Sequence, residues 1–191
     1  MGSIFSSWLN QFVNYLPLAL AILILSLALL VSVAVYVEPP ENLRGAIEDE
    51  IRSVSVALTN TSFIERIYII FTRNALINIL FALPFFINVV VYMSTMITTA
   101  WALNISAVNL EIATGIPRQL SIVSLMLMPH TYLELYSYSL SIIASLKLTL
   151  SFLSRRIDRT LLYNFILTVL VSHIMLLTAA IVETVLITFI Q

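Results

Sequence analysis

An uncharged stretch, LPLALAILILSLALLVSVAVYV at residues 16–37, decides the fold class of this chain. No charged residue occurs between Met1 and Val37, and a run of about 20 apolar residues is enough to cross the ~30 Å hydrocarbon core of a bilayer. Ser32-Val33-Ala34 loosely resembles the small-residue cleavage site of a secretory signal peptide. However, the basic region that precedes such a peptide is missing and the apolar run is too long, which favours an uncleaved membrane span.

The composition of the whole chain also indicates a membrane protein. Of its 191 residues, 60% are hydrophobic and only 10% are charged, with a mean hydropathy of +1.03. Soluble globular chains carry about 25% charged residues, so this composition excludes a cytosolic enzyme, a disordered tail and a secreted module. The net charge of −1, with nine Lys and Arg, offers no patch for nucleic acid. The lack of Cys excludes disulfides and thiolate metal sites.

One strongly polar segment follows the first span. Residues 38–66 contain six acidic residues and three Arg, which gives 3 − 6 = −3. A helix should start after Pro39-Pro40, and its apolar residues form one stripe. Residues 38–64 are therefore expected to be an amphipathic segment. Its apolar stripe could lie on the membrane surface, on the other spans or on a partner. The stripe consists of Leu43, Ile47, Ile51, Val54 and Leu58. Ser62 and Glu65 have the spacing of a capping box, which predicts a new helix start there.

The next apolar stretch is too long for one straight span. Residues 67–104 as a single helix would measure ~56 Å, almost twice the bilayer core. Pro84 lies near the middle and removes a backbone donor, so a helix break is expected there. The alternatives are two spans, or one kinked span with an interfacial end.

Charge placement favours two spans. The basic cluster at residues 155–159 should lie in the cytoplasm and the acidic segment outside. Residues 119–153, with a break at Pro129, supply only one crossing, so residues 67–104 must supply two. The prediction is an all-α, polytopic membrane bundle with about five transmembrane helices in one integral membrane domain, residues 1–191. The spans are 16–37, 65–83, 85–103, 119–153 and 161–190.

This arrangement predicts a multi-pass protein of the cell membrane with a cytoplasmic N-terminus and an external C-terminus. Residues 104–118 become an outer loop. Two glycosylation sequons, at Asn60 and at Asn104, fall on segments predicted to be external, which is weak support because sequons are common by chance.

Ionisable residues within the apolar stretches are the main candidates for a functional site, because such groups are costly in lipid and normally find partners between helices. They are Arg73, His130, Glu134, Lys147, His173 and Glu183. Measured from the basic cluster at ~1.5 Å per residue, His130, Glu134 and Glu183 lie ~31–37 Å away, at one outer level. Lys147 is expected to anchor at the inner interface, and the lone His173 to be a satisfied interior residue.

We therefore predict one buried polar cluster near the outer leaflet, comprising Arg73, Asn74, His130, Glu134 and Glu183. Two carboxylates at one depth cannot both stay charged without a cation or proton between them. The cluster could be a hydrogen-bonded clamp, a proton or cation site, or a metal centre. No HExxH motif or third close ligand supports a metal, so no metal or other cofactor is expected.

Small residues mark the faces along which the helices should pack. Ser137, Ser141 and Ser145 continue the face of His130 and Glu134, and small residues at this spacing let membrane helices approach closely. Similar stripes occur on the second span, at Asn74 and Asn78, and on the last span. The stripe of the last span contains Thr168, Ser172, Ala179 and Glu183.

Three short motifs resemble the stage II sporulation protein M family. Residues 129–135, PHTYLEL, are similar to the family's Pro-His-x-x-x-Glu-Leu motif, carried here by Pro129, His130 and Glu134. Residues 71–74, FTRN, and 179–184, AAIVET, are similar to its Phe-x-x-Asn and Ala-x-x-Glu elements. Thr131 replaces the Gly usual after the motif His, and Met93-Ser94 replaces an Asn-Gly pair.

The resemblance implies a non-catalytic integral membrane scaffold or interaction subunit in an envelope or membrane-remodelling complex. The family's namesake acts with partners that degrade cell-wall peptidoglycan during sporulation. The expected partners are therefore the lipid bilayer and either other proteins or further copies of this chain, with no nucleic acid. The alternative is a small ion- or proton-coupled transporter or channel that uses the His/Glu/Arg cluster.

Overall fold

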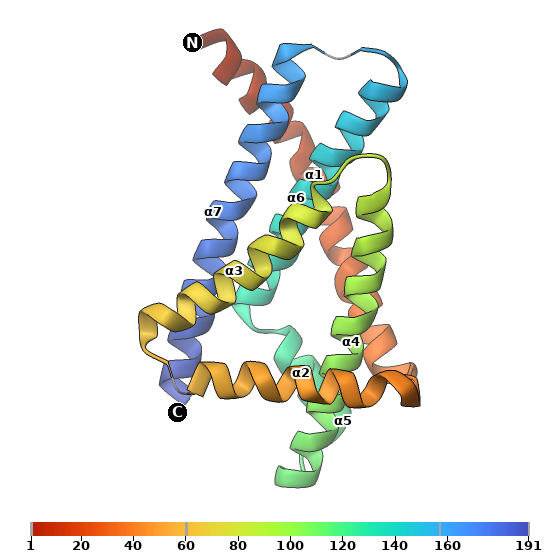
Figure 1. Cartoon of the computed structure of the whole chain (residues 1–191), viewed down its shortest axis with the longest axis vertical. Coiled ribbons are helices and arrows are strands. Elements are labelled where there is room, and N and C mark those ends of the chain that lie inside the picture. Colours follow the sequence, from red (N-terminus) through yellow and green to blue (C-terminus); the bar gives the residue numbers. More distant parts are fainter. Residues whose placement is uncertain (1, 60, 157, 191) are drawn as a thin grey trace.

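A computed structural model describes residues 2–59, 61–156 and 158–190, and within them the chain forms seven α-helices and no strand (Figure 1). Asn60 of the first sequon and Ile157 of the basic cluster lie outside the described residues. The prediction of an all-α bundle is confirmed. The helices are α1 (Gly2–Tyr36), α2 (Glu41–Thr59), α3 (Phe63–Phe81), α4 (Ile87–Thr114), α5 (Arg118–Met126), α6 (Pro129–Leu153) and α7 (Arg159–Ile190).

Five long helices run back and forth between the two ends of the molecule, and α2 lies across one of these ends (Figure 1). The N-terminus, the turn between α3 and α4, and the connection from α6 to α7 are at one end. The C-terminus, α2 and the connection from α4 to α5 are at the other, which we call the α2 end.

Among the described residues, three helices are long and apolar enough to cross a membrane: α1 over Trp8–Tyr36, α4 over Ile87–Thr114 and α7 over Arg159–Phe189. This is fewer than the five spans predicted from the sequence. Helix α3 carries three charged residues within 19 positions, Glu65, Arg66 and Arg73. Helix α6 mixes its apolar residues with serines and tyrosines. These polar side chains lower the hydropathy of both helices. The serines of α6 between residues 137 and 145 are buried inside the bundle, whereas Glu65 and Arg73 of α3 are exposed.

Helix α6 forms the centre of the bundle and packs against α1, α3, α4 and α7. Twelve of its residues are buried, including every position from Ser137 to Ser145. The fully buried Phe81 ring of α3 packs edge-on against Tyr138 of α6 and Tyr92 of α4, with ring centroids 5.1 and 5.2 Å apart. Edge-to-face aromatic pairs of this kind add about 0.5–1.5 kcal/mol beyond their buried area.

The predicted break at Pro84 is confirmed. Helix α3 ends at Phe81, α4 begins at Ile87, and Pro84 lies in the turn between them. Phe85 and Phe86 adopt left-handed backbone angles, with φ of 68° and 61°. A bulky residue in this region costs roughly 1–2 kcal/mol, so the turn needs support from its neighbours.

Two buried hydroxyls of α6 supply that support. Ser145 donates a hydrogen bond of 2.6 Å to the carbonyl oxygen of Leu83. Thr149 accepts one of 2.9 Å from the backbone N–H of Phe85. Both side chains are fully buried. The stripe of small residues on α6 thus satisfies the backbone of the turn as well as allowing close packing.

The break predicted at Pro129 is confirmed, and it divides residues 119–153. Helix α5 ends at Met126, and Pro129 is the first residue of α6. At this position the missing N–H of proline costs nothing and its fixed φ suits the helix.

The predicted outer loop at residues 104–118 is wrong. Helix α4 continues to Thr114, and Gly115 ends it in a left-handed conformation, φ 74°, with its N–H bonded to the carbonyl of Glu111. The sequon residue Asn104 is buried and donates a 2.6 Å hydrogen bond to the carbonyl of Ala34 in α1. The Asn104 side chain, which the sequence predicted to lie in an outer loop, is therefore engaged in a contact between α4 and α1.

The acidic segment forms the expected helix, α2, which begins at Glu41 directly after the two prolines. The capping box is also confirmed, because Ser62 and Glu65 exchange side-chain and backbone hydrogen bonds at the start of α3. Within the predicted stripe of α2, Ile47, Ile51, Val54 and Leu58 are half-buried, whereas Leu43 is exposed. No residue of α2 is fully buried, so this helix rests on the bundle surface.

Candidate functional site

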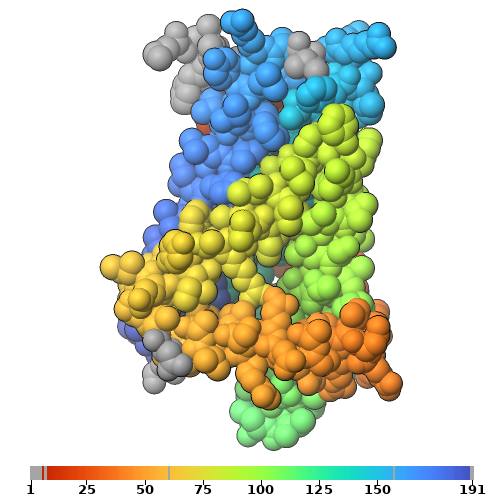
Figure 2. Space-filling view, viewed as in Figure 1, coloured from red at the N-terminus to blue at the C-terminus, as the bar shows by residue number. Residues whose placement is uncertain are grey.

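A cavity of about 330 Å³ lies beneath α2 at the α2 end of the bundle. Figure 2 shows the molecular surface hollowed where α2, α3 and α4 meet. All seven helices contribute to the cavity wall, with α5 present through Leu125 and Met126 and α7 through Glu183. The volume is at the lower limit of ordinary small-molecule sites, about 300–1,000 Å³.

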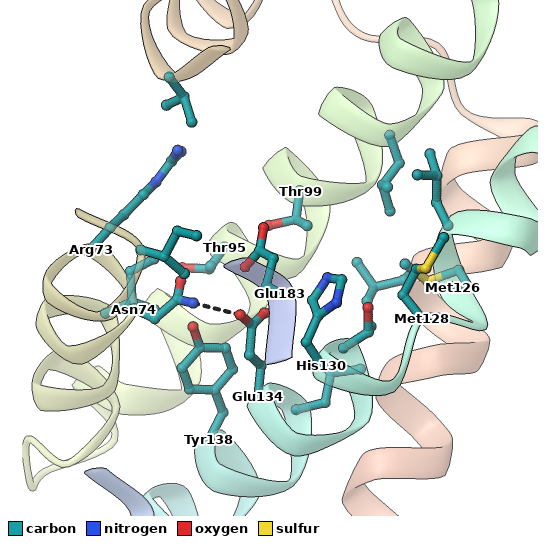
Figure 3. Close-up of a pocket in the computed structure, with 18 of the residues that line it drawn as sticks. Arg73, Asn74, Thr95, Thr99, Met126, Met128, His130, Glu134, Tyr138 and Glu183 are labelled. Carbon is teal, nitrogen blue, oxygen red and sulfur yellow. Dashed lines mark hydrogen bonds between the residues drawn. The ribbon is translucent and has the colours of Figure 1, made fainter. Parts of the chain in front are cut away.

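The structure brings all five residues of the predicted polar cluster to this cavity, namely Arg73, Asn74, His130, Glu134 and Glu183. They come from three helices: α3, α6 and α7. The Asn74 amide donates a 2.6 Å hydrogen bond to one carboxylate oxygen of Glu134. Figure 3 shows Glu134, Glu183 and His130 directed into the same space.

Arg73 differs from the prediction, because it is not buried. Its guanidinium forms an ion pair with Glu50 of α2, at 2.5 Å, and its side chain is 45% exposed. In Figure 3 the Arg73 side chain extends away from Glu134 and Glu183 towards α2. The sequence analysis placed the acidic segment apart from the cluster. It could not show that Glu50 of α2 would compete with Glu134 and Glu183 for the Arg73 guanidinium.

Glu183 and His130 have unused hydrogen-bonding capacity. Glu183 is half-buried. Within the described residues its carboxylate has no hydrogen-bond partner and forms no salt bridge. The Nδ1 atom of His130 is buried and has no partner among the described residues. An unpaired buried polar atom costs about 1–3 kcal/mol, so the cavity is equipped to bind a polar group.

A second buried polar network links the same three helices nearer the middle of the bundle. Asn78 of α3 donates a 2.8 Å hydrogen bond to Ser172 of α7, and Ser172 shares a 2.9 Å bond with Ser141 of α6. The stripes of small and polar residues expected to pack together therefore meet here. His173 Nδ1 lies 2.8 Å from the carbonyl oxygen of Val169, so this lone histidine is a satisfied interior residue, as expected.

Contacts at the opposite end are of another kind. The Lys147 ammonium lies 5.3 Å from the centre of the Tyr15 ring, a cation–π contact between α6 and α1. Asn164 of α7 donates to Gln11 of α1 at 2.5 Å. These contacts join helices and line no cavity with carboxylates.

Four hydroxyl-bearing residues line the cavity, and sequence reasoning assigned none of them to the site: Thr95 and Thr99 of α4, and Thr131 and Tyr138 of α6. Tyr138 follows Glu134 by four positions and could have been found by helical spacing. The two threonines of α4 gave no such signal, because nothing in the sequence relates α4 to the motif helix.

Carboxylate and imidazole groups in a partly enclosed cavity can accept hydrogen bonds or balance a positive charge. No group of three or more His, Asp or Glu side chains within the described residues is arranged to hold a metal ion. Comparison of the chain with protein-family models, curated proteins and solved structures gave no match.

Proposed function

We propose that this chain is a five-pass, non-catalytic membrane subunit of the stage II sporulation protein M type, acting as a scaffold in an envelope or membrane-remodelling complex. Two observations support this assignment: the motif residues Pro129, His130 and Glu134, and the back-and-forth course of α1, α3, α4, α6 and α7 (Figure 1). Helices α3 and α6 would cross the bilayer with Asn78 of α3 and the buried serines of α6 turned towards the bundle interior.

The proposed orientation has a cytoplasmic N-terminus and an external C-terminus. Two features support it: the α6–α7 connection with its arginines shares one end with the N-terminus, and the acidic α2 shares the other end with the C-terminus (Figure 1). Basic residues in short loops favour the cytoplasmic side.

The observation that carries the scaffold role is the position of α2. This helix crosses the α2 end with its apolar stripe half-buried and its remaining surface exposed. That surface bears four acidic residues and two arginines, 2 − 4 = −2. A charged helix held across the end of the bundle offers a rigid platform to a basic surface of another membrane-associated protein or of a second copy of this chain.

Co-purification from native membranes in mild detergent tests this role. We expect a stoichiometric partner that is lost when Glu41 and Asp49, both exposed on α2, are changed to Lys. Glu111 of α4 is also exposed, so Glu111→Lys is the matched control. This variant should still co-purify with the partner. Isolation of the chain without any partner, under conditions that preserve known membrane complexes, would contradict the scaffold role.

A small ion- or proton-coupled transporter is the second candidate, favoured by the presence of Glu134 and Glu183 in one cavity. Reconstituted liposomes distinguish the two roles. A transporter should carry ion or proton flux that Glu134→Gln abolishes in a correctly folded protein, whereas a scaffold should give no flux above that of empty liposomes.

A further inference from the structure

The charges that line the cavity do not balance. The two salt bridges among the described residues are Arg44–Glu48 and Arg73–Glu50, and neither includes Glu134 or Glu183. Glu134 is bonded to the neutral amide of Asn74. When ionised, the two carboxylates of the cavity therefore lack a directly bound cation.

The other cavity walls are largely hydrocarbon. Apolar lining residues come from every helix except α7, and they include Leu30, Ile70, Ile77, Met96, Leu103 and Leu135. A bare alkali cation needs only a shell of oxygen ligands and gains nothing from the twelve apolar residues that line the cavity. The space, about 330 Å³, is also far larger than a metal ion requires.

From these observations we infer that the cavity binds a primary ammonium group carried on a short hydrocarbon chain. Such a group has one positive charge and three N–H donors. Its strongest acceptors in the cavity are the carboxylates of Glu134 and Glu183 and the unpaired Nδ1 of His130 in its neutral form. The hydroxyls of Thr95, Thr99 and Tyr138 line the same space. The hydrocarbon chain would contact the apolar wall. This site requires no partner protein, so it goes beyond the scaffold role and is tested separately from it.

Glu50 keeps the cavity free for such a ligand. It holds the Arg73 guanidinium outside, on the α2 side, although the Arg73 side chain lines the cavity. Released from Glu50, Arg73 would be a tethered cation able to reach the same two carboxylates. The Arg73–Glu50 pair therefore sets the affinity of the site for the external cation.

Calorimetric titration of the purified full chain, in mild detergent and an amine-free buffer, tests the site. The probe is butylammonium, and the comparison ligands are butanol, tetramethylammonium and K⁺. We expect saturable binding of butylammonium in the millimolar range or tighter. Butanol lacks the charge, tetramethylammonium lacks N–H donors and K⁺ lacks the apolar chain, so each should bind at least about tenfold more weakly.

Carboxamide variants locate the binding. Glu134→Gln and Glu183→Gln should each weaken butylammonium binding by about tenfold or more, because a hydrogen bond to a charged group is lost. Glu111→Gln removes an exposed carboxylate of α4 and should leave binding unchanged. Since Glu183 has no hydrogen bond in the described structure to lose, its variant tests the site even if Glu134→Gln disturbs folding.

The role of Glu50 has its own matched control. Glu50→Gln should weaken butylammonium binding by freeing Arg73, whereas Glu48→Gln, which breaks the other α2 ion pair, should not. Equal affinities of these two variants would refute the proposed competition by Arg73. Absence of saturable butylammonium binding, or equal affinity in the wild type and both carboxamide variants, would overturn the site itself. Tighter binding of K⁺ than of butylammonium would overturn the ligand class.

Discussion

Replacement of Thr149 by Val probes how the turn between α3 and α4 is held. Valine has nearly the shape of threonine, so the packing of this fully buried position is preserved and no cavity is created. The substitution removes the acceptor that lies 2.9 Å from the backbone nitrogen of Phe85. The hydroxyl's other bond, to the carbonyl of Ser145 in its own helix, is lost as well.

The expected cost follows from the groups left behind. The Ser145 carbonyl belongs to the regular helix and retains its backbone partner. Loss of the Thr149 hydroxyl bond to this carbonyl therefore changes the free energy of unfolding only slightly. The Phe85 N–H has no replacement partner, and an unsatisfied donor costs about 1–3 kcal/mol. Phe85 and Phe86 are also held in left-handed conformations that the lost bond helps to maintain. We therefore expect the free energy of unfolding to fall by about 1–3 kcal/mol.

Unfolding in mixed micelles with increasing denaturing detergent, followed by circular dichroism, measures this change. Thr178→Val is the matched control, because the exposed Thr178 hydroxyl bonds only to the carbonyl of Ile174 within α7. It should change stability by less than about 0.5 kcal/mol. If Thr149→Val were no more destabilising than this control, the α6 hydroxyls would not support the turn.

Three further predictions concern topology, α2 and packing. A cysteine at the exposed Ser53 of α2 should react with an impermeant thiol reagent in intact cells, and one at the exposed Ser154 should not; the opposite pattern would reverse the proposed orientation. Ile51→Glu should release α2 without unfolding the bundle, seen as faster proteolysis after Arg52, since the α2 stripe is only half-buried. Unaltered proteolysis would show that the stripe does not hold α2. Ser141→Leu should destabilise the bundle by about 1–3 kcal/mol in the same unfolding assay, because the position is fully buried against α7, and an unchanged midpoint would argue against close packing there.

Local features of this protein could be read directly from its sequence. The helical membrane class follows from residues 16–37 and the scarcity of charge. The helix limits at Pro84 and Pro129, and the capping box at Ser62, follow from backbone chemistry that involves only neighbouring residues. The shared depth of His130, Glu134 and Glu183 followed from counting helical residues, and all three line one cavity.

Other features depended on which helices lie side by side. Hydropathy distinguishes apolar from polar faces, but it does not distinguish a face covered by lipid from one covered by protein. The serines of α6 therefore indicated a packing face but not that four other helices would surround it. Asn104 was read as an exposed sequon, although its side chain is hydrogen-bonded to α1.

The partner of Arg73 shows the same division between local and tertiary information. The sequence determined that a guanidinium within an apolar stretch needs a carboxylate, because an unpaired charge is costly there. It offered Glu134 and Glu183 on the same level but could not place Glu50 near them. Only the tertiary structure lays α2 across the α2 end and brings Glu50 to Arg73, and this long-range contact leaves two carboxylates of the cavity without a bound cation.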